Sequence, residues 1–210
     1  MAMDAELTAA LGRHAASDLL KGLPGRPAAA LDPYLDAAAR CLARYGIERT
    51  TVMDVAHAMG VNRGTVYRQI GTMETQIRLL AARDLRRFLD TVPGRIGGLT
   101  GPALVVELAA ITVEDTKAHP VVAKILSDEP RLVGQILETH IGHVRDLVVP
   151  VFAALFDAGM GAGLIAPMDP TVLASWLVRI VVTLIVLDPE IELRDYLREF
   201  LMPALSPRPA

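Results

Sequence analysis

The chain has 210 residues and a formal net charge of −3, and 52% of its residues are hydrophobic although only 4% are aromatic. This length allows a sizeable buried core, and an apolar mass made mainly of Ala, Leu, Val and Ile favours packed helices over a β-sandwich. The negative charge argues against a nonspecific binder of polyanions, and the single cysteine, Cys41, excludes an intramolecular disulfide.

The first predicted helix follows an N-terminal arm, residues 1–31, which ends in a stretch rich in Gly and Pro. Asp32 followed by Pro33 predicts a helix start, with the acid as N-cap and the proline at the first helical position. This helix is expected to end at about Gly46.

Two short helices are predicted next. The first begins at Thr50 or Thr51 and ends at Gly60, because glycine readily takes the left-handed conformation that closes a helix. Asn62 is expected to cap the second, which runs to about Gln69.

Longer helices complete the predicted fold. Residues 93–101, with four glycines, are expected to form a loop between the fourth helix and those that follow. The apolar run 172–187 is shorter than the ~20 residues that a bilayer requires. It also contains Arg179, so we expect a buried helix rather than a membrane span.

The remaining helices are expected at about residues 72–90, 102–118, 120–129, 131–160, 170–187 and 189–201. We therefore predict an all-α fold of about nine or ten helices.

Charge differs between the two parts of the chain. Residues 32–92 contain nine Arg and seven acidic residues, whereas residues 93–210 contain nine basic and fourteen acidic residues. This asymmetry is typical of a nucleic-acid-binding module joined to an acidic domain. We assign residues 32–78 to a three-helix, helix-turn-helix DNA-binding domain and residues 79–210 to a helical ligand-binding and dimerisation domain. Because the N-terminus lacks the pattern of a signal peptide, we expect a cytoplasmic protein.

The segment from Thr51 to Gln69 has the pattern of a helix-turn-helix. Apolar residues at helical spacing anchor its first helix, and Val66 packs the second helix onto it, which leaves a polar and basic face outside. Arginine can pair with guanine and glutamine with adenine, whereas hydroxyls and helix N-termini suit phosphates. We therefore predict binding to double-stranded DNA through Thr50, Thr51, Asn62, Arg63, Gly64, Thr65, Tyr67, Arg68, Gln69 and Thr72.

This part of the chain resembles the TetR family of bacterial regulators. The residues that carry the resemblance are Leu35–Ala38, Tyr45-Gly46, Thr50-Thr51, Asp54–Ala56, the run Gly60–Arg68 and Glu74. The rest of the chain matches only in its layout of helices. The resemblance implies a homodimer that binds an operator as a repressor and is released by a small effector. It also implies that Tyr67 contacts a phosphate.

Two positions depart from the family's pattern. The family usually has an aromatic residue where Ile70 stands and a lysine where Met73 stands. That lysine often contacts phosphate at the start of the fourth helix, and a methionine cannot replace it. We therefore expect this phosphate anchor to lie at Thr72 or Arg49 instead.

The resemblance further implies an effector pocket among the helices after Thr100. The side chains that we expect to line it are mostly apolar, which predicts an uncharged or weakly polar ligand and no cofactor. They are Leu108, Ile111, Thr112, Asp115, His140, Ile141 and Val144.

The helix predicted at residues 170–187 carries a wide aliphatic stripe around Trp176. A two-fold-related helix of a second copy would cover such a stripe, and burial within the chain itself is the alternative. We expect a homodimer interface formed by Leu173, Trp176, Leu177, Ile180, Leu184, Tyr196 and Phe200.

His140 and His143 provide an alternative function. Two histidines three residues apart on a helix can bind one metal ion, and acids of another helix (Glu107, Glu114 or Asp115) could complete the site. A helical metal-binding protein or enzyme is therefore the alternative, whereas a core or pocket role for His140 requires no metal. The sequence contains no phosphate loop, nucleophile elbow or His-Glu-x-x-His motif, so we predict that the protein is not an enzyme.

Overall fold

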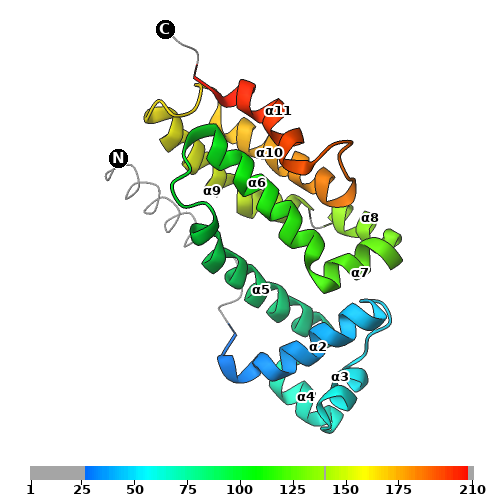
Figure 1. Cartoon of the computed structure of the whole chain (residues 1–210). Coiled ribbons are helices and arrows are strands. Elements are labelled where there is room, and N and C mark those ends of the chain that lie inside the picture. The colour runs from blue at the N-terminus through cyan, green and yellow to red at the C-terminus, as the bar shows by residue number, and fades with distance from the viewer. Residues whose placement is uncertain (1–26, 140, 208–210) are drawn as a thin grey trace. The chain divides into compact units, whose positions relative to one another are not determined.

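A computed structural model of the chain describes residues 27–139 and 141–207 (Figure 1). That part of the chain forms ten α-helices and one 3₁₀ turn, without a β-strand, which confirms the predicted all-α fold. A 3₁₀ turn, η2 (Ala29–Leu31), precedes the helices. The helices are α2 (Asp32–Tyr45), α3 (Val52–Met59), α4 (Arg63–Ile70), α5 (Met73–Arg95), α6 (Gly101–Ala118), α7 (Pro120–Asp128), α8 (Pro130–Thr139), α9 (Ile141–Gly161), α10 (Pro170–Val186) and α11 (Leu193–Leu205).

The described residues separate into two compact units. The first unit combines residues 27–89 with residues 117–139, and the second combines residues 90–116 with residues 141–207. Both α5 and α6 therefore contribute to each unit. The helix-turn-helix segment thus shares its unit with α7 and α8, which follow it much later in the chain.

The first unit has a core of its own, in which α2, α3 and α4 bury one face each. Leu35, Leu42, Val55 and Val66 are fully buried there. Val121 of α7 joins them. Cys41 lies in the same core, and burial raises the pKa of its thiol. The anchoring of α3 and α4 through their apolar faces agrees with the predicted helix-turn-helix.

Local capping signals explain where the short helices begin and end. The Thr51 side chain accepts a hydrogen bond from the Asp54 amide, and the Asp54 carboxylate accepts one from the Thr51 amide (2.8 Å). This capping box begins α3, and Gly60 ends it with a left-handed backbone (φ 64°). The Asn62 side chain then accepts a hydrogen bond from the Thr65 amide (2.9 Å) and begins α4. The predicted caps of both helices are confirmed.

Three predicted boundaries are wrong. Leu31 occupies the N-cap position of α2, and the Asp32 carboxylate instead lies 3.6 Å from the Arg83 guanidinium. Helix α5 continues through Pro93 to Arg95, because a proline removes a single hydrogen bond so near the end of a helix. Helix α11 begins four residues after the predicted Pro189, because the Glu192 side chain caps the Asp195 amide (3.0 Å). The structure describes two helices, α8 and α9, where a single helix is predicted at residues 131–160. His140, between them, lies outside the described residues.

A buried arginine joins α2 and α5 in the first unit. The Arg83 side chain, of which only 6% is exposed, donates hydrogen bonds to Asp36 (2.8 Å) and Asp84 (2.9 Å). Asp84 also contacts the His119 ring nitrogen Nε2 at 3.1 Å. Burial raises the pKa of Asp84, but the hydrogen bonds from His119 and Arg83 outweigh it and hold this pKa below its usual value. These contacts link α2, α5 and the start of α7.

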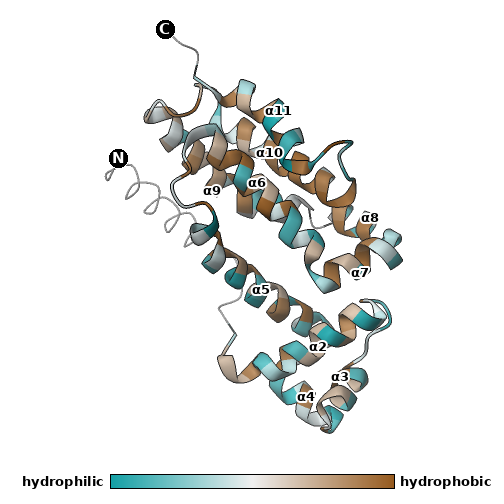
Figure 2. Cartoon of the chain, in the orientation of Figure 1, coloured by the Kyte–Doolittle hydropathy of each residue, from teal (hydrophilic) through white to brown (hydrophobic). Residues whose placement is uncertain are grey.

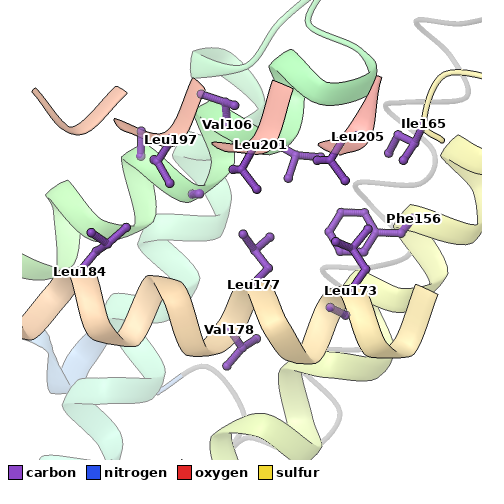
Figure 3. Close-up of a cluster of buried hydrophobic side chains, with 14 of the residues drawn as sticks. Val106, Phe156, Ile165, Leu173, Leu177, Val178, Leu184, Leu197, Leu201 and Leu205 are labelled. Carbon is purple, nitrogen blue, oxygen red and sulfur yellow. The ribbon is translucent and has the colours of Figure 1, made fainter. Parts of the chain in front are cut away.

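The second unit is built around α10, which is predominantly hydrophobic along its length (Figure 2). Leu173, Leu177 and Leu184 extend from α10 into a cluster with leucines of α11 (Figure 3). Phe156 of α9 and Val106 of α6 complete this core. No helix in the described part of the chain is both long and apolar enough to cross a membrane.

Candidate nucleic-acid interface

Helix α4 divides into a buried face and an exposed face. Val66 and Ile70 are almost completely buried and fix the helix on the core of the first unit. Around the rest of the helix, Arg63, Tyr67, Arg68 and Gln69 are all exposed. A short helix that is held from one side and presents polar, basic side chains on the other can enter the major groove of DNA.

Arg63 and Tyr67 lie one helical turn apart and contact each other. The Arg63 guanidinium lies 5.0 Å from the centroid of the Tyr67 ring, and its Nη2 donates a hydrogen bond to the Tyr67 hydroxyl oxygen (3.2 Å). Because that oxygen accepts here, the hydroxyl proton of Tyr67 can be donated to another acceptor. The guanidinium also keeps further N–H donors, so the pair suits an anionic oxygen such as that of a phosphate.

The N-terminal turn of α4 is held by a second set of side-chain contacts. The Thr65 hydroxyl contacts Asn62 Oδ1 (3.2 Å), and Arg68 Nη2 donates to the Thr65 hydroxyl oxygen (3.2 Å). A Cβ atom at Gly64 would lie 3.3 Å from Asn62 Oδ1, closer than most Cβ contacts. Asn62, Gly64 and Thr65 thus shape this turn, and exposed Arg68 extends from it.

The two threonines that precede α3 have different environments. Thr50 is only 6% exposed, and its hydroxyl donates to the carbonyl oxygens of Cys41 and Gly46. The prediction that this hydroxyl meets a phosphate is therefore wrong, because the α2–α3 connection uses it internally. Thr51 is exposed, but its hydroxyl bonds to Asp54, which lowers the pKa of that carboxyl. The first amides of α3, at Val52 and Met53, remain without intrahelical acceptors and suit a phosphate.

Met73 and Thr72 lie at the start of α5, where the phosphate-binding lysine was expected in the family's pattern. Met73 is half-buried and packs against the core of the first unit, so an apolar residue is favourable there. Thr72 is exposed, and its hydroxyl accepts a hydrogen bond from the Thr75 amide (3.3 Å). Arg49 is exposed as well and donates from Nε to the carbonyl oxygen of Tyr45 (2.8 Å). Both expected substitutes for the phosphate-binding lysine are at the surface.

The expected effector-binding residues are only partly described. Ile111 is fully buried, and the Thr112 hydroxyl donates to the carbonyl oxygen of half-buried Leu108 (2.6 Å). The Asp115 carboxylate pairs with Arg95 of α5. His140 lies outside the described residues, as do the side chains of Ile141 and Val144, so only the α6 members can be placed.

The acids considered for a metal site are engaged with arginines. Arg194 of α11 bonds to Glu107 (2.9 Å) and to Glu114 of α6, and the hydrogen bonds from Arg194 lower the pKa of Glu107. The His140 and His143 side chains lie outside the described part. Within that part, no group of three or more potential metal-binding side chains occurs.

The expected dimer-interface residues separate into buried and exposed sets. Leu173, Leu177 and Leu184 fill the core of the second unit, so the prediction that they meet a partner is wrong. Their burial follows from α11 packing on that side of α10. Ile180 and Tyr196 are half-buried at the edge of this core. The exposed large hydrophobic side chains of α10 and α11 include Val172 (65%), Trp176 (41%) and Phe200 (56%).

Comparisons with known proteins agree with this geometry. Residues 35–83 match the family model of bacterial regulatory proteins of the tetR family. The HTH-type transcriptional regulator Rv1255c of Mycobacterium tuberculosis is 26% identical to this chain over 86% of it and 88% of its own length. Salmonella enterica GusR has a similar fold, with a TM-score of 0.64 at 20% identity over 83% of this chain and 94% of its own. AibR, solved in complex with isovaleryl coenzyme A and operator DNA, has a TM-score of 0.57 at 20% identity over 83% and 97%.

Proposed function

The chain belongs to the TetR family of DNA-binding bacterial regulators, and we propose that it is a homodimeric repressor released from a palindromic operator by a small, mostly apolar effector. The observation that carries this proposal is that α4 is anchored by buried Val66 and Ile70 while its polar side chains Arg63, Tyr67, Arg68 and Gln69 are exposed. Two copies of this helix, related by a two-fold axis, would enter successive major grooves about 34 Å apart on one side of the duplex.

Each side chain on the proposed interface has a chemical role. Gln69 and Arg68 are assigned to base edges, since amide and guanidinium groups can make paired hydrogen bonds in the major groove. Arg63 with Tyr67, Thr72 and the first amides of α3 are assigned to phosphates, which fix the orientation of the protein on the duplex. Asn62, Gly64 and Thr65 hold the N-terminal turn of α4 in the shape that permits close approach.

Release by an effector requires that the effector bind the DNA-competent and DNA-free states unequally. We propose that the effector binds among the residues after Thr100 that are predicted to line a pocket. Among the described members of that set, the carboxylate of Asp115 is paired with Arg95, so the set offers no unpaired acid. An uncharged, mostly apolar molecule suits such surroundings. The complex of AibR with isovaleryl coenzyme A, an acyl group on a carrier, supports effectors with an apolar part.

The dimer is proposed to form through the exposed apolar side chains of α10 and α11. Val172 and Trp176 lie one helical turn apart on α10, and Phe200 contacts Tyr196 on α11 with ring centroids 5.0 Å apart. A second copy would remove these side chains from water, and a two-fold axis would place the same patch on both partners.

Charge introduced into this patch is expected to separate the dimer. Trp176→Glu would place a carboxylate within the apolar patch of each copy, so sedimentation should show monomers under conditions in which the unchanged chain is dimeric. Leu164→Glu is the matched control, because Leu164 is exposed to a similar extent (38%) outside α10 and α11. A Trp176→Glu chain that sediments as a dimer would refute the proposed interface.

The repressor function is tested by selecting duplexes from a random pool with the purified chain. We expect enrichment of one sequence with two related half-sites, and binding that weakens steeply as salt is raised. Compounds that release the selected duplex would then identify the effector class. Failure to enrich any sequence at low salt would refute sequence-specific DNA binding.

A further inference from the structure

Glu129 occupies the junction of α7 and α8 and has an unusual environment for a carboxylate. The residue is only 8% exposed. Its Oε2 accepts a hydrogen bond from the Ile47 amide (3.0 Å), and its Oε1 accepts one from the Glu48 amide (3.0 Å). These partners precede it by 82 and 81 residues, so the contact joins distant parts of the chain within the first unit.

The two amides belong to the turn that connects α2 to α3. On this turn, Gly46 ends α2 with a positive φ of 87°, and a Cβ atom built there would lie only 2.4 Å from Glu129 Oε1. Glycine is therefore favoured at position 46 by its backbone conformation and also by the carboxylate against it. The turn is fitted closely around Glu129.

A second set of bonds holds the same turn from within. The Thr50 hydroxyl donates to the carbonyl oxygens of Gly46 (2.6 Å) and Cys41 (3.2 Å). Thr51, the next residue, is the N-cap of α3. The turn from which α3 starts is thus held by Thr50 and, from the α7–α8 junction, by Glu129. Helix α4 packs on α3, so the exposed face of α4 depends on the same turn.

We infer that Glu129 is a positioning residue for DNA binding, which acts without touching DNA by holding the α2–α3 turn through its two carboxylate oxygens. A turn held in place presents α3 and α4 in one orientation, and DNA then binds without the cost of ordering them. The inference rests on the DNA-binding part of the proposed function and is independent of the effector. It also makes the α7–α8 junction a place where a structural change would alter DNA affinity.

Glu129→Gln tests this inference, because the amide has almost the shape of the carboxylate but only one acceptor oxygen. Hydrogen exchange measured by NMR should become about tenfold faster at the Ile47 and Glu48 amides, as expected when a hydrogen bond to a charged acceptor is lost. Affinity for the selected duplex should fall several-fold. Its salt dependence and base preference should stay unchanged, since no DNA contact is removed.

The sign of the affinity change separates positioning from electrostatics. Replacing an acid with an amide removes one negative charge from the unit that binds DNA, and this alone would strengthen binding. Glu138→Gln, at an exposed position on α8, is the matched control for that charge effect. Weaker binding by Glu129→Gln, together with equal or stronger binding by Glu138→Gln, supports the inference.

Two outcomes would overturn it. Unchanged exchange at both amides would show that Glu129 does not hold the turn. Faster exchange with unweakened DNA binding would show that its role is structural only. If Glu129→Gln does not fold, Glu129→Asp provides the same test with the charge retained, because its shorter side chain cannot reach both amides. If the unchanged chain binds no duplex, the proposed function fails, and the positioning role fails with it.

Discussion

Replacing Arg83 with methionine is expected to lower the free energy of unfolding by about 2 kcal/mol, less than the loss of one partner from a fully buried ion pair, because the partner carboxylates are partly exposed. The Arg83 side chain is almost entirely buried and faces Asp32, Asp36 and Asp84. Without the guanidinium, these carboxylates would repel one another, and Asp36 and Asp84 would lose the hydrogen bonds from Arg83. Urea denaturation followed by circular dichroism, at one fixed protein concentration, measures the change.

Arg78→Met is the matched control for Arg83→Met. Arg78 lies on the same helix and pairs with Glu74, but the side chains of both residues are largely exposed (67% and 75%). An exposed pair of this kind contributes at most about 1 kcal/mol, so the control should unfold nearly as the unchanged chain does. Equal stability of the two variants would contradict the structural role assigned to Arg83.

Tyr67→Phe and Gln69→Ala are expected to weaken DNA binding in two distinguishable ways. Tyr67→Phe retains the ring under the Arg63 guanidinium but removes the hydroxyl that is assigned to phosphate. Since phosphates carry no base identity, affinity should fall by a similar factor for every duplex. Gln69→Ala should cost about 1–3 kcal/mol with the preferred base pair at one operator position and relax the preference there.

The measurement is a titration of each variant against the selected operator and single-base-pair variants of it. Tyr67→Phe should give parallel losses across this set, whereas Gln69→Ala should give a loss confined to the position that it reads. Ile136→Ala, an exposed change on α8 of the same unit, serves as a control for general surface effects. A change of base preference in Tyr67→Phe would contradict the assignment of this residue to phosphate.

Features that depend on neighbours in the sequence were predictable. The caps of α3 and α4 follow from the side chains of Thr51 and Asn62, each three residues from the amide that it satisfies. The end of α3 follows from the left-handed backbone that Gly60 adopts. The two faces of α4 follow from helical periodicity in the same way. The helix-turn-helix could therefore be located from its own residues.

Features that depend on distant partners were not predictable. Asp32 has the sequence context of an N-cap, but it lies beside Arg83, about fifty residues later. Leu173, Leu177 and Leu184 form a stripe that either α11 or a second copy could cover, and periodicity does not distinguish these partners. Glu129 had no local signal at all, because its two hydrogen-bond donors lie more than eighty residues away.

The buried position of Cys41 allows local opening of the first unit to be measured chemically. A thiol-modifying reagent reacts with the thiolate, and burial both shields this group and raises its pKa. Since the chain contains no other cysteine, the rate of alkylation would report how often the packing of α2 against α3 and α4 is transiently lost. Operator DNA that stabilises the closed form would slow this labelling, so a single chemical readout would follow local opening with and without the duplex.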